Sequence, residues 1–135
     1  MQPDEVLPGS PRDWMRHARS DLELARSGRA PGVLLEALCF HAQQAAEKSL
    51  KAVLVASGIA VPRTHNIKSL LDSLPERLSV PADIADAAIL TDYAVVSRYP
   101  GDFEPVSEEE YREALTLATG VLKWAEAVLQ AWGKN

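Results

Sequence analysis

The sequence predicts an all-α protein, an antiparallel four-helix bundle with one additional short helix. Apolar residues recur at three- and four-residue spacing over long stretches, which is the period of an amphipathic helix. Serine or asparagine precedes several of these stretches, as is typical of helix starts. No segment shows the sustained alternation of a β-strand, and modest connections place neighbouring helices side by side.

A single domain is expected from 135 residues, of which 47% are hydrophobic. Residues 1–10 contain two prolines and a glycine without periodicity, so we expect a loose lead-in there. Residues 11–135 then form the helical domain.

The first helix is predicted from Pro11 to about Ser27. Ser10 can act as the N-cap, Pro11 suits the first helical position, and Asp13 falls three residues after the cap. Gly28 ends the helix. The apolar face comprises Trp14, Ala18, Leu22 and Ala25.

The second helix is predicted over residues 33–57, a stretch without glycine or proline that Gly58 ends. At 1.5 Å per residue, roughly 24 residues would span about 36 Å and set the length of the domain. The apolar stripe comprises Leu35, Leu38, Cys39, Ala42, Ala46, Leu50, Val53 and Leu54.

A short third helix is predicted between its cap, Asn66, and Pro75, which cannot continue a helix. The fourth helix is predicted from near Pro81 to around Arg98, because a proline two residues later disfavours helical backbone before it. Its apolar residues are Ile84, Ala88, Tyr93 and Val96.

The last helix is predicted to follow Ser107, which forms a capping box with Glu110. The acidic residues of its first turn also complement the helix dipole. Its apolar face comprises Tyr111, Leu115, Ala118, Leu122, Ala125 and Leu129.

The net charge of −5 argues against a protein that coats DNA, because nonspecific phosphate binding needs an excess of Lys and Arg. The charge is unevenly distributed. Residues 41–70 carry four basic residues against one acidic residue, a balance of +3, whereas residues 71–135 carry 12 acidic residues against 5 basic ones. An anion site is therefore expected in the middle of the chain.

We expect a soluble, cytoplasmic protein without a membrane segment. The sequence has no run of about 18 uncharged apolar residues, and its N-terminus lacks the basic-then-apolar order of a secretory signal. The single cysteine, Cys39, agrees with a reducing compartment and is expected to be a small buried apolar residue.

The second helix also carries a polar face opposite its apolar stripe. At about 100° per residue one sector, with Lys48 at its edge, contains Glu36, Phe40, Gln43, Gln44, Glu47 and Lys51. One interpretation is a solvated face on which Glu47 pairs with Gln43 and Lys51 at four-residue spacing. The other interpretation is a binding surface.

Two short polar segments favour the binding surface. Arg63-Thr64-His65 follows the second helix, and Ser97-Arg98-Tyr99-Pro100-Gly101 ends the fourth. Loops and helix ends of this kind commonly hold binding groups. The structural alternatives are a cation at a helix C-terminus for Arg98 and a turn at Pro100-Gly101.

Together these motifs resemble the characteristic pattern of prokaryotic HEPN domains. In chain order they are Ala42-Gln43-Gln44-Ala45-Ala46-Glu47-Lys48-Ser49-Leu50-Lys51-Ala52, Arg63-Thr64-His65-Asn66-Ile67 and Ser97-Arg98-Tyr99-Pro100. The resemblance spans roughly residues 13–130. It implies a four- or five-helix bundle, usually a homodimer, often encoded beside a small nucleotidyltransferase in a toxin–antitoxin-like pair.

The chain departs from the pattern of the HEPN ribonucleases. Many of these metal-independent enzymes use an arginine followed four to six residues later by a histidine. Here no histidine follows Arg98, and His65 lies two positions after Arg63. Because acid–base cleavage needs a group that exchanges protons near neutral pH, the missing pair argues against nuclease activity, and no catalytic residue is assigned.

The resemblance and the polar face predict a nucleotide- or RNA-binding site comprising Gln44, Glu47, Lys48, Lys51, Arg63, His65, Arg98 and Tyr99. In this site the guanidinium of Arg98 holds a phosphate, the two lysines add charge, and Tyr99 stacks on a base. Glu47 positions a basic side chain, and His65 either contacts the ligand or ties its loop to the third helix. The prediction requires Glu47, Lys51, His65 and Arg98 to converge.

Three functions follow from these features. The first is an HEPN-type module that binds nucleotide or RNA and a partner nucleotidyltransferase, as a homodimer. The second is a metal-independent endoribonuclease that uses Arg98 with Tyr99 or His65, and the third is a purely structural interaction bundle. No cofactor is expected, and His17 and Asp21, although four residues apart, lack a third metal ligand.

Overall fold

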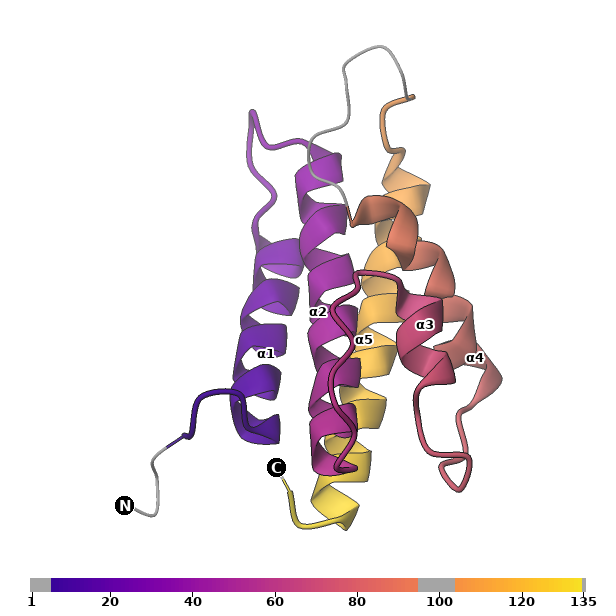
Figure 1. The fold of residues 1–135 in the computed structure, drawn as a ribbon. Helices are drawn as coiled ribbons and strands as arrows, with labels where there is room; N and C mark the ends of the chain where they lie inside the picture. Colours follow the sequence, from indigo (N-terminus) through magenta and orange to yellow (C-terminus); the bar gives the residue numbers. More distant parts are fainter. Residues whose placement is uncertain (1–5, 95–103, 135) are drawn as a thin grey trace.

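The computed structural model describes residues 6–94 and 104–134, which form helices and no β-strand (Figure 1). The long helices are α1 (Pro11–Ser27), α2 (Leu35–Ala56) and α5 (Glu108–Ala131). The shorter elements are α3 (Ile67–Asp72), α4 (Ala82–Ala85) and the 3-10 helix η1 (Asp86–Tyr93). The all-α bundle predicted from the sequence is confirmed. None of the helices among these residues is both long and apolar enough to cross a membrane.

The helix α2 packs against both α1 and α5, and α1 also contacts α5 (Figure 1). It runs antiparallel to α1, and η1 runs antiparallel to α5. Residues 57–66 lead the chain back along the bundle from the end of α2 to the start of α3. Because η1 also runs opposite to α2, the next helix, α5, runs in the same direction as α2. This returning segment passes beside the polar face of α2, which decides the surroundings of the candidate site.

One apolar core joins the elements. Leu50, Val53 and Leu54 of α2 are fully buried and belong to the same cluster as Ile67 of α3 and Leu129 of α5. Burying one such side chain contributes roughly 1.5–3 kcal/mol. The core therefore fixes the rotation of α2 about its axis, and with it the direction in which its polar side chains point.

The first two helices match the predicted ranges. The helix α1 has the predicted bounds, and α2 lies within residues 33–57. Gly28 ends α1 with a hydrogen bond from its N–H to the Leu24 carbonyl. A Cβ at this position would lie 2.5 Å from the Leu24 carbonyl oxygen and 2.9 Å from Leu38, so only glycine fits without a shift. Cys39 is fully buried, as predicted.

The predicted caps of α3 and α5 are also confirmed. The Ser107 hydroxyl accepts from the Glu110 N–H, and the Glu110 carboxylate accepts from the Ser107 N–H. The Asn66 side chain accepts from the Ser69 N–H at the start of α3. His65 immediately precedes this cap, so the start of α3 helps to fix its position.

The fourth helix differs from the prediction. Instead of one α-helix from near Pro81 to Arg98, the chain forms the four-residue α4 and the eight-residue 3-10 helix η1. The buried residues are Ile84, Ala87 and Leu90, spaced by three. A 3-10 helix has three residues per turn and places such residues on one side. The predicted end at Arg98 lies outside the described residues.

Candidate functional site

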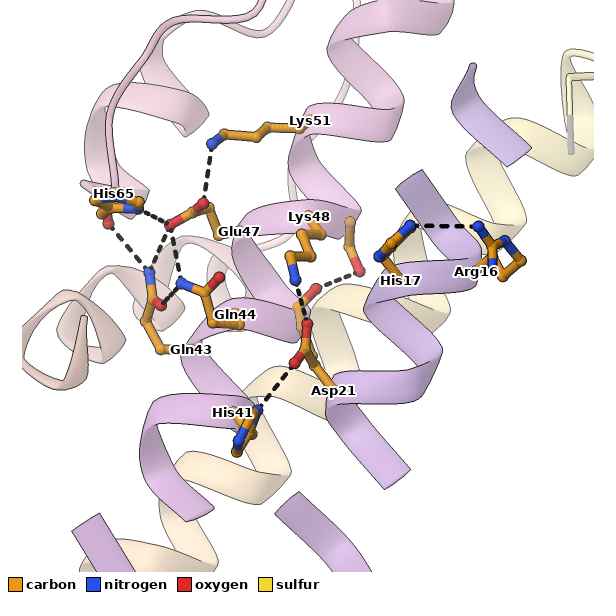
Figure 2. Close-up of polar contacts among 12 residues, drawn as sticks. Arg16, His17, Asp21, His41, Gln43, Gln44, Glu47, Lys48, Lys51 and His65 are labelled. Atoms are coloured by element: carbon orange, nitrogen blue, oxygen red, sulfur yellow. Dashed lines mark hydrogen bonds and ion pairs between the residues drawn. The ribbon is translucent and has the colours of Figure 1, made fainter. Parts of the chain in front are cut away.

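Glu47 of α2 lies at the centre of a buried polar network. Its carboxylate accepts hydrogen bonds from Lys51 Nζ at 2.9 Å, from His65 Nδ1 at 2.9 Å and from Gln43 Nε2 at 3.1 Å (Figure 2). Glu47 is only 2% exposed. We call Gln43, Gln44, Glu47, Lys51 and His65 the Glu47 network.

The fold brings these residues together by two routes. Gln43 and Lys51 lie one helical turn before and after Glu47, which is the spacing of neighbours on a helix face. His65 arrives from the returning segment, and Gln43 also donates to the His65 carbonyl at 3.1 Å. Gln44 donates to Gln43 Oε1 at 2.8 Å and completes the network.

The network lowers the pKa of Glu47. Burial raises the pKa, because a charged carboxylate loses hydration. The hydrogen bonds from Lys51, Gln43 and His65 outweigh burial and hold the pKa of Glu47 below its ordinary value of 4.5. Glu47 is therefore an anion near neutral pH.

The hydrogen bond to Glu47 uses only one of the two ring nitrogens of His65. A carboxylate only accepts hydrogen bonds, so the Nδ1 that contacts Glu47 carries a proton. The second ring nitrogen, Nε2, has no hydrogen-bond partner among the described residues, and the side chain is 70% exposed. His65 thus has a fixed orientation and a nitrogen that can contact a ligand.

Three residues on the polar face of α2 are buried: Gln43 is 0% exposed, Glu47 2% and Lys51 7%. The predicted pairing of Glu47 with Gln43 and Lys51 is confirmed, but the predicted solvation of these three residues is wrong. The cause is coverage from both sides. The returning segment brings His65 over Glu47, and Trp14 of α1 lies with its ring centroid 5.6 Å from Lys51 Nζ.

Both lysines of the predicted site are paired within the chain. Lys51 binds Glu47, and Lys48 Nζ donates to Asp21 Oδ2 of α1 at 2.6 Å. Asp21 also lies 2.9 Å from His41 Nδ1 (Figure 2). The two lysines therefore neutralise carboxylates, and the expected contribution of their free charge to phosphate binding is not supported by this geometry.

We call Asp21, His41 and Lys48 the Asp21 cluster. His41 is not among the residues predicted from the sequence, because its partner lies 20 residues away on another helix. His17 and Asp21, considered above for their four-residue spacing, share no hydrogen bond or ion pair in the structure. His17 points to Asp13 and Arg16, and no group of three or more potential metal ligands occurs in the described part of the chain.

The remaining predicted residues lie apart from this network or outside the description. Arg63 is exposed in the returning segment and forms no ion pair with residues 6–94 or 104–134. Glu36, on the same sector of α2, accepts from the Val106 N–H at 2.7 Å near α5. Arg98 and Tyr99 lie outside the described residues. Convergence therefore holds for Glu47, Lys51 and His65, and its fourth member is untested.

The comparison with protein families decides the classification. The sequence model described as "HEPN domain" matches residues 11–128. The chain belongs to the HEPN family. None of the curated proteins matches this HEPN chain.

Three solved structures resemble this HEPN domain. TT1696 from Thermus thermophilus is 37% identical, with a TM-score of 0.78 over 88% of this chain and 98% of that one. ST0689, an archaeal HEPN homologue, is 33% identical, with a TM-score of 0.72 over 89% of this chain and 98% of that one. The HEPN domain protein tm0613 from Thermotoga maritima is 27% identical, with a TM-score of 0.56 over 89% and 93%.

Proposed function

We propose that this HEPN domain binds a nucleotide or RNA through phosphate contacts of Arg63 and His65. The observation that carries the proposal is the anchored, exposed imidazole of His65, held by the buried carboxylate of Glu47. A side chain that is already held in one orientation loses little conformational entropy when it binds a ligand. An exposed imidazole held in this way therefore favours a binding role. Glu47, with Lys51 and Gln43, positions His65.

Charge supports the same location. Asp21 and Glu47 cancel Lys48 and Lys51, so Arg63 is the cation left for an anion in this region of the described chain, and His65 adds a positive charge only when its ring is protonated. A guanidinium binds phosphate through two parallel hydrogen bonds. We retain Arg98 as a second phosphate ligand and Tyr99 as a stacking ring in the proposed site.

The test is a titration of labelled single-stranded RNA, followed by fluorescence anisotropy at several salt concentrations. Arg63→Ala should weaken binding roughly tenfold or more, because a hydrogen bond to a charged group contributes about 1.5–3 kcal/mol. It should also reduce the salt dependence by about one phosphate contact. Arg112→Ala is the matched control, because Arg112 is also exposed and lies on α5.

Two substitutions at His65 separate anchoring from contact. His65→Asn places an amide N–H near the position of Nδ1, so it can keep the bond to Glu47 while it removes Nε2. His65→Gln reaches toward the position of Nε2 and loses the anchor. Both substitutions should weaken RNA binding. Wild-type affinity in both single variants, His65→Asn and Arg63→Ala, would refute the proposal.

A second candidate function, a metal-independent endoribonuclease, is favoured by the Glu47–His65 pair. A carboxylate that orients an imidazole is a common arrangement in acid–base catalysis. The test is incubation of RNA with purified protein in the presence of a chelator. Cleavage that disappears in both His65→Asn and Arg98→Ala would support the enzyme, and intact RNA with the wild-type chain would exclude it.

We further propose that the domain acts in the cytoplasm as a homodimer, with a nucleotidyltransferase as its partner in a toxin–antitoxin-like pair. The support is membership of the HEPN family, in which such arrangements are frequent. Sedimentation velocity of the purified chain tests the dimer. Coexpression with the product of an adjacent nucleotidyltransferase gene tests the partner, and a stable complex of fixed stoichiometry is the expected result.

A further inference from the structure

A second histidine is held in the same way as His65. His41 Nδ1 lies 2.9 Å from Asp21 Oδ1, and Lys48 Nζ donates to the other carboxylate oxygen (Figure 2). Asp21 is 8% exposed, whereas the His41 side chain is 33% exposed. In the Asp21 cluster, as in the Glu47 network, a buried carboxylate orients an imidazole and a lysine neutralises the carboxylate.

The anchored His41 offers one defined atom for recognition. Because the carboxylate of Asp21 accepts, Nδ1 of His41 carries the proton, and Nε2 of the neutral ring is an acceptor. Nε2 has no hydrogen-bond partner among the residues that the structure describes. Fixing one ring nitrogen in this way selects the tautomer that the other presents.

An aromatic ring adjoins the His41 imidazole. The rings of Phe40 and His41 are 5.3 Å apart between centroids and inclined by 72°. Phe40 is partly exposed, and Gln44, one turn further along α2, is partly exposed too. The Gln44 amide nitrogen donates to Gln43 and Glu47, and its oxygen has no partner within the described ranges.

The charge of the Asp21 cluster argues against a phosphate. Asp21 and Lys48 cancel each other, so only protonation of His41 would give the cluster a positive charge. A flat group with apolar faces and a polar edge suits an aromatic ring beside a neutral acceptor. Nucleobases have this chemistry.

We infer that Phe40 and His41 form a nucleobase-binding position, in which the base stacks on Phe40 and His41 Nε2 accepts from its edge. The inference rests on the proposed function, because the phosphate of the same ligand lies at Arg63 and His65. Phe40 precedes Glu47 by two helical turns, about 10.5 Å along α2, which neighbouring nucleotides of one strand can span. The ligand class is therefore single-stranded RNA, and Asp21 is a positioning residue.

The experiment compares a short single-stranded RNA with an abasic oligomer that has the same length and the same number of phosphates. Binding of both is measured by anisotropy for the wild type, Phe40→Leu and His41→Asn. Phe40→Leu keeps an apolar residue on α2, and His41→Asn keeps an N–H near Asp21 but removes Nε2. Thermal unfolding of each variant checks that it is folded.

The wild type should prefer the RNA over the abasic oligomer. Phe40→Leu should reduce this preference roughly 5- to 150-fold, because stacking of a base on an aromatic ring contributes about 1–3 kcal/mol. His41→Asn should reduce it about fivefold, the effect of one hydrogen bond of about 1 kcal/mol. Affinity for the abasic oligomer should stay unchanged in both variants.

The failures of the two proposals are distinguishable. An unchanged preference in both variants overturns the base position and leaves the phosphate site standing. Arg63→Ala should weaken the binding of both oligomers by the same factor, and unchanged binding in this variant counts against the phosphate site. A wild-type chain that binds neither oligomer overturns both proposals.

Discussion

Glu47 has no solvent to stabilise its charge and depends on its neighbours. Four donors from two segments of the chain surround it, and one of them, Lys51, is itself 7% exposed. A buried ion pair is costly to break, because removing one member leaves the other charge without compensation. The orientation of His65 and part of the stability of the domain therefore depend on the same carboxylate.

Lys51→Met should destabilise the domain by about 2–3 kcal/mol. Breaking a buried ion pair typically costs about 3–5 kcal/mol, and Gln43 and His65 still compensate Glu47 here. Urea unfolding measures the loss. The double variant Glu47→Leu with Lys51→Met should recover much of it, because neither charge remains. A cost below about 0.5 kcal/mol, as for a surface pair, would contradict the buried network.

The lowered pKa of Glu47 gives the network a pH dependence of defined sign. The stabilisation is fully present above the ordinary value of 4.5 and is lost as the pH falls through the lower pKa of the folded state. The difference in unfolding free energy between wild type and Glu47→Gln should thus be constant near neutral pH and shrink in acid. Urea unfolding at successive pH values measures it, and a difference that grows in acid would contradict the assignment.

The start of α3 links a helix cap to the candidate site. Asn66 caps α3 and directly follows His65. Asn66→Ala should cost about 1 kcal/mol, as loss of an N-cap does, and should also weaken RNA binding because His65 is less firmly placed. Ser107→Ala is the matched control, because it removes the cap of α5 at a similar cost. Equal RNA affinity of the two variants would show that the α3 cap does not contribute to the placement of His65.

The helices that periodicity and caps could predict are those with long, regular apolar stripes. The prediction of the fourth element is wrong because its residues permit two periods. Ile84 and Ala88 fit the four-residue spacing of an α-helix, whereas Ile84, Ala87 and Leu90 fit three residues per turn and are the ones buried. Packing against α5 and α2, which local sequence does not contain, decides between them.

Part of the Glu47 network was predictable from the sequence, but its burial was not. The spacing of Gln43, Glu47 and Lys51 placed them on one face, and His65 was identified from its loop. Their burial was not predictable, because periodicity describes a helix without the segment that later covers it. The link from Asp21 to His41 likewise arises only when α1 and α2 pack.

The outer surface near the α1–α2 connection bears on assembly. Leu24 is 48% and Leu34 is 68% exposed, and Leu24 lines a surface hollow with Ser27 and Gly28. Exposed apolar side chains that gather at one end of a molecule mark contact surfaces more often than those scattered singly. If the proposed homodimer uses this end, the double variant Leu24→Glu with Leu34→Glu should sediment as a monomer. A double variant that still sediments as a dimer would show that the interface lies elsewhere on the molecule.

The position of Trp14 gives the polar interior an optical readout. Its indole lies over Lys51 Nζ, 5.6 Å from the ring centroid, and the same ammonium group contacts Glu47. Protonation of the carboxylate or binding of a ligand that displaces the ammonium changes the electric field at the indole. The wavelength of tryptophan fluorescence emission should shift as a result. With Trp124 and Trp132 replaced by phenylalanine, the chain would report on its own interior without an attached dye.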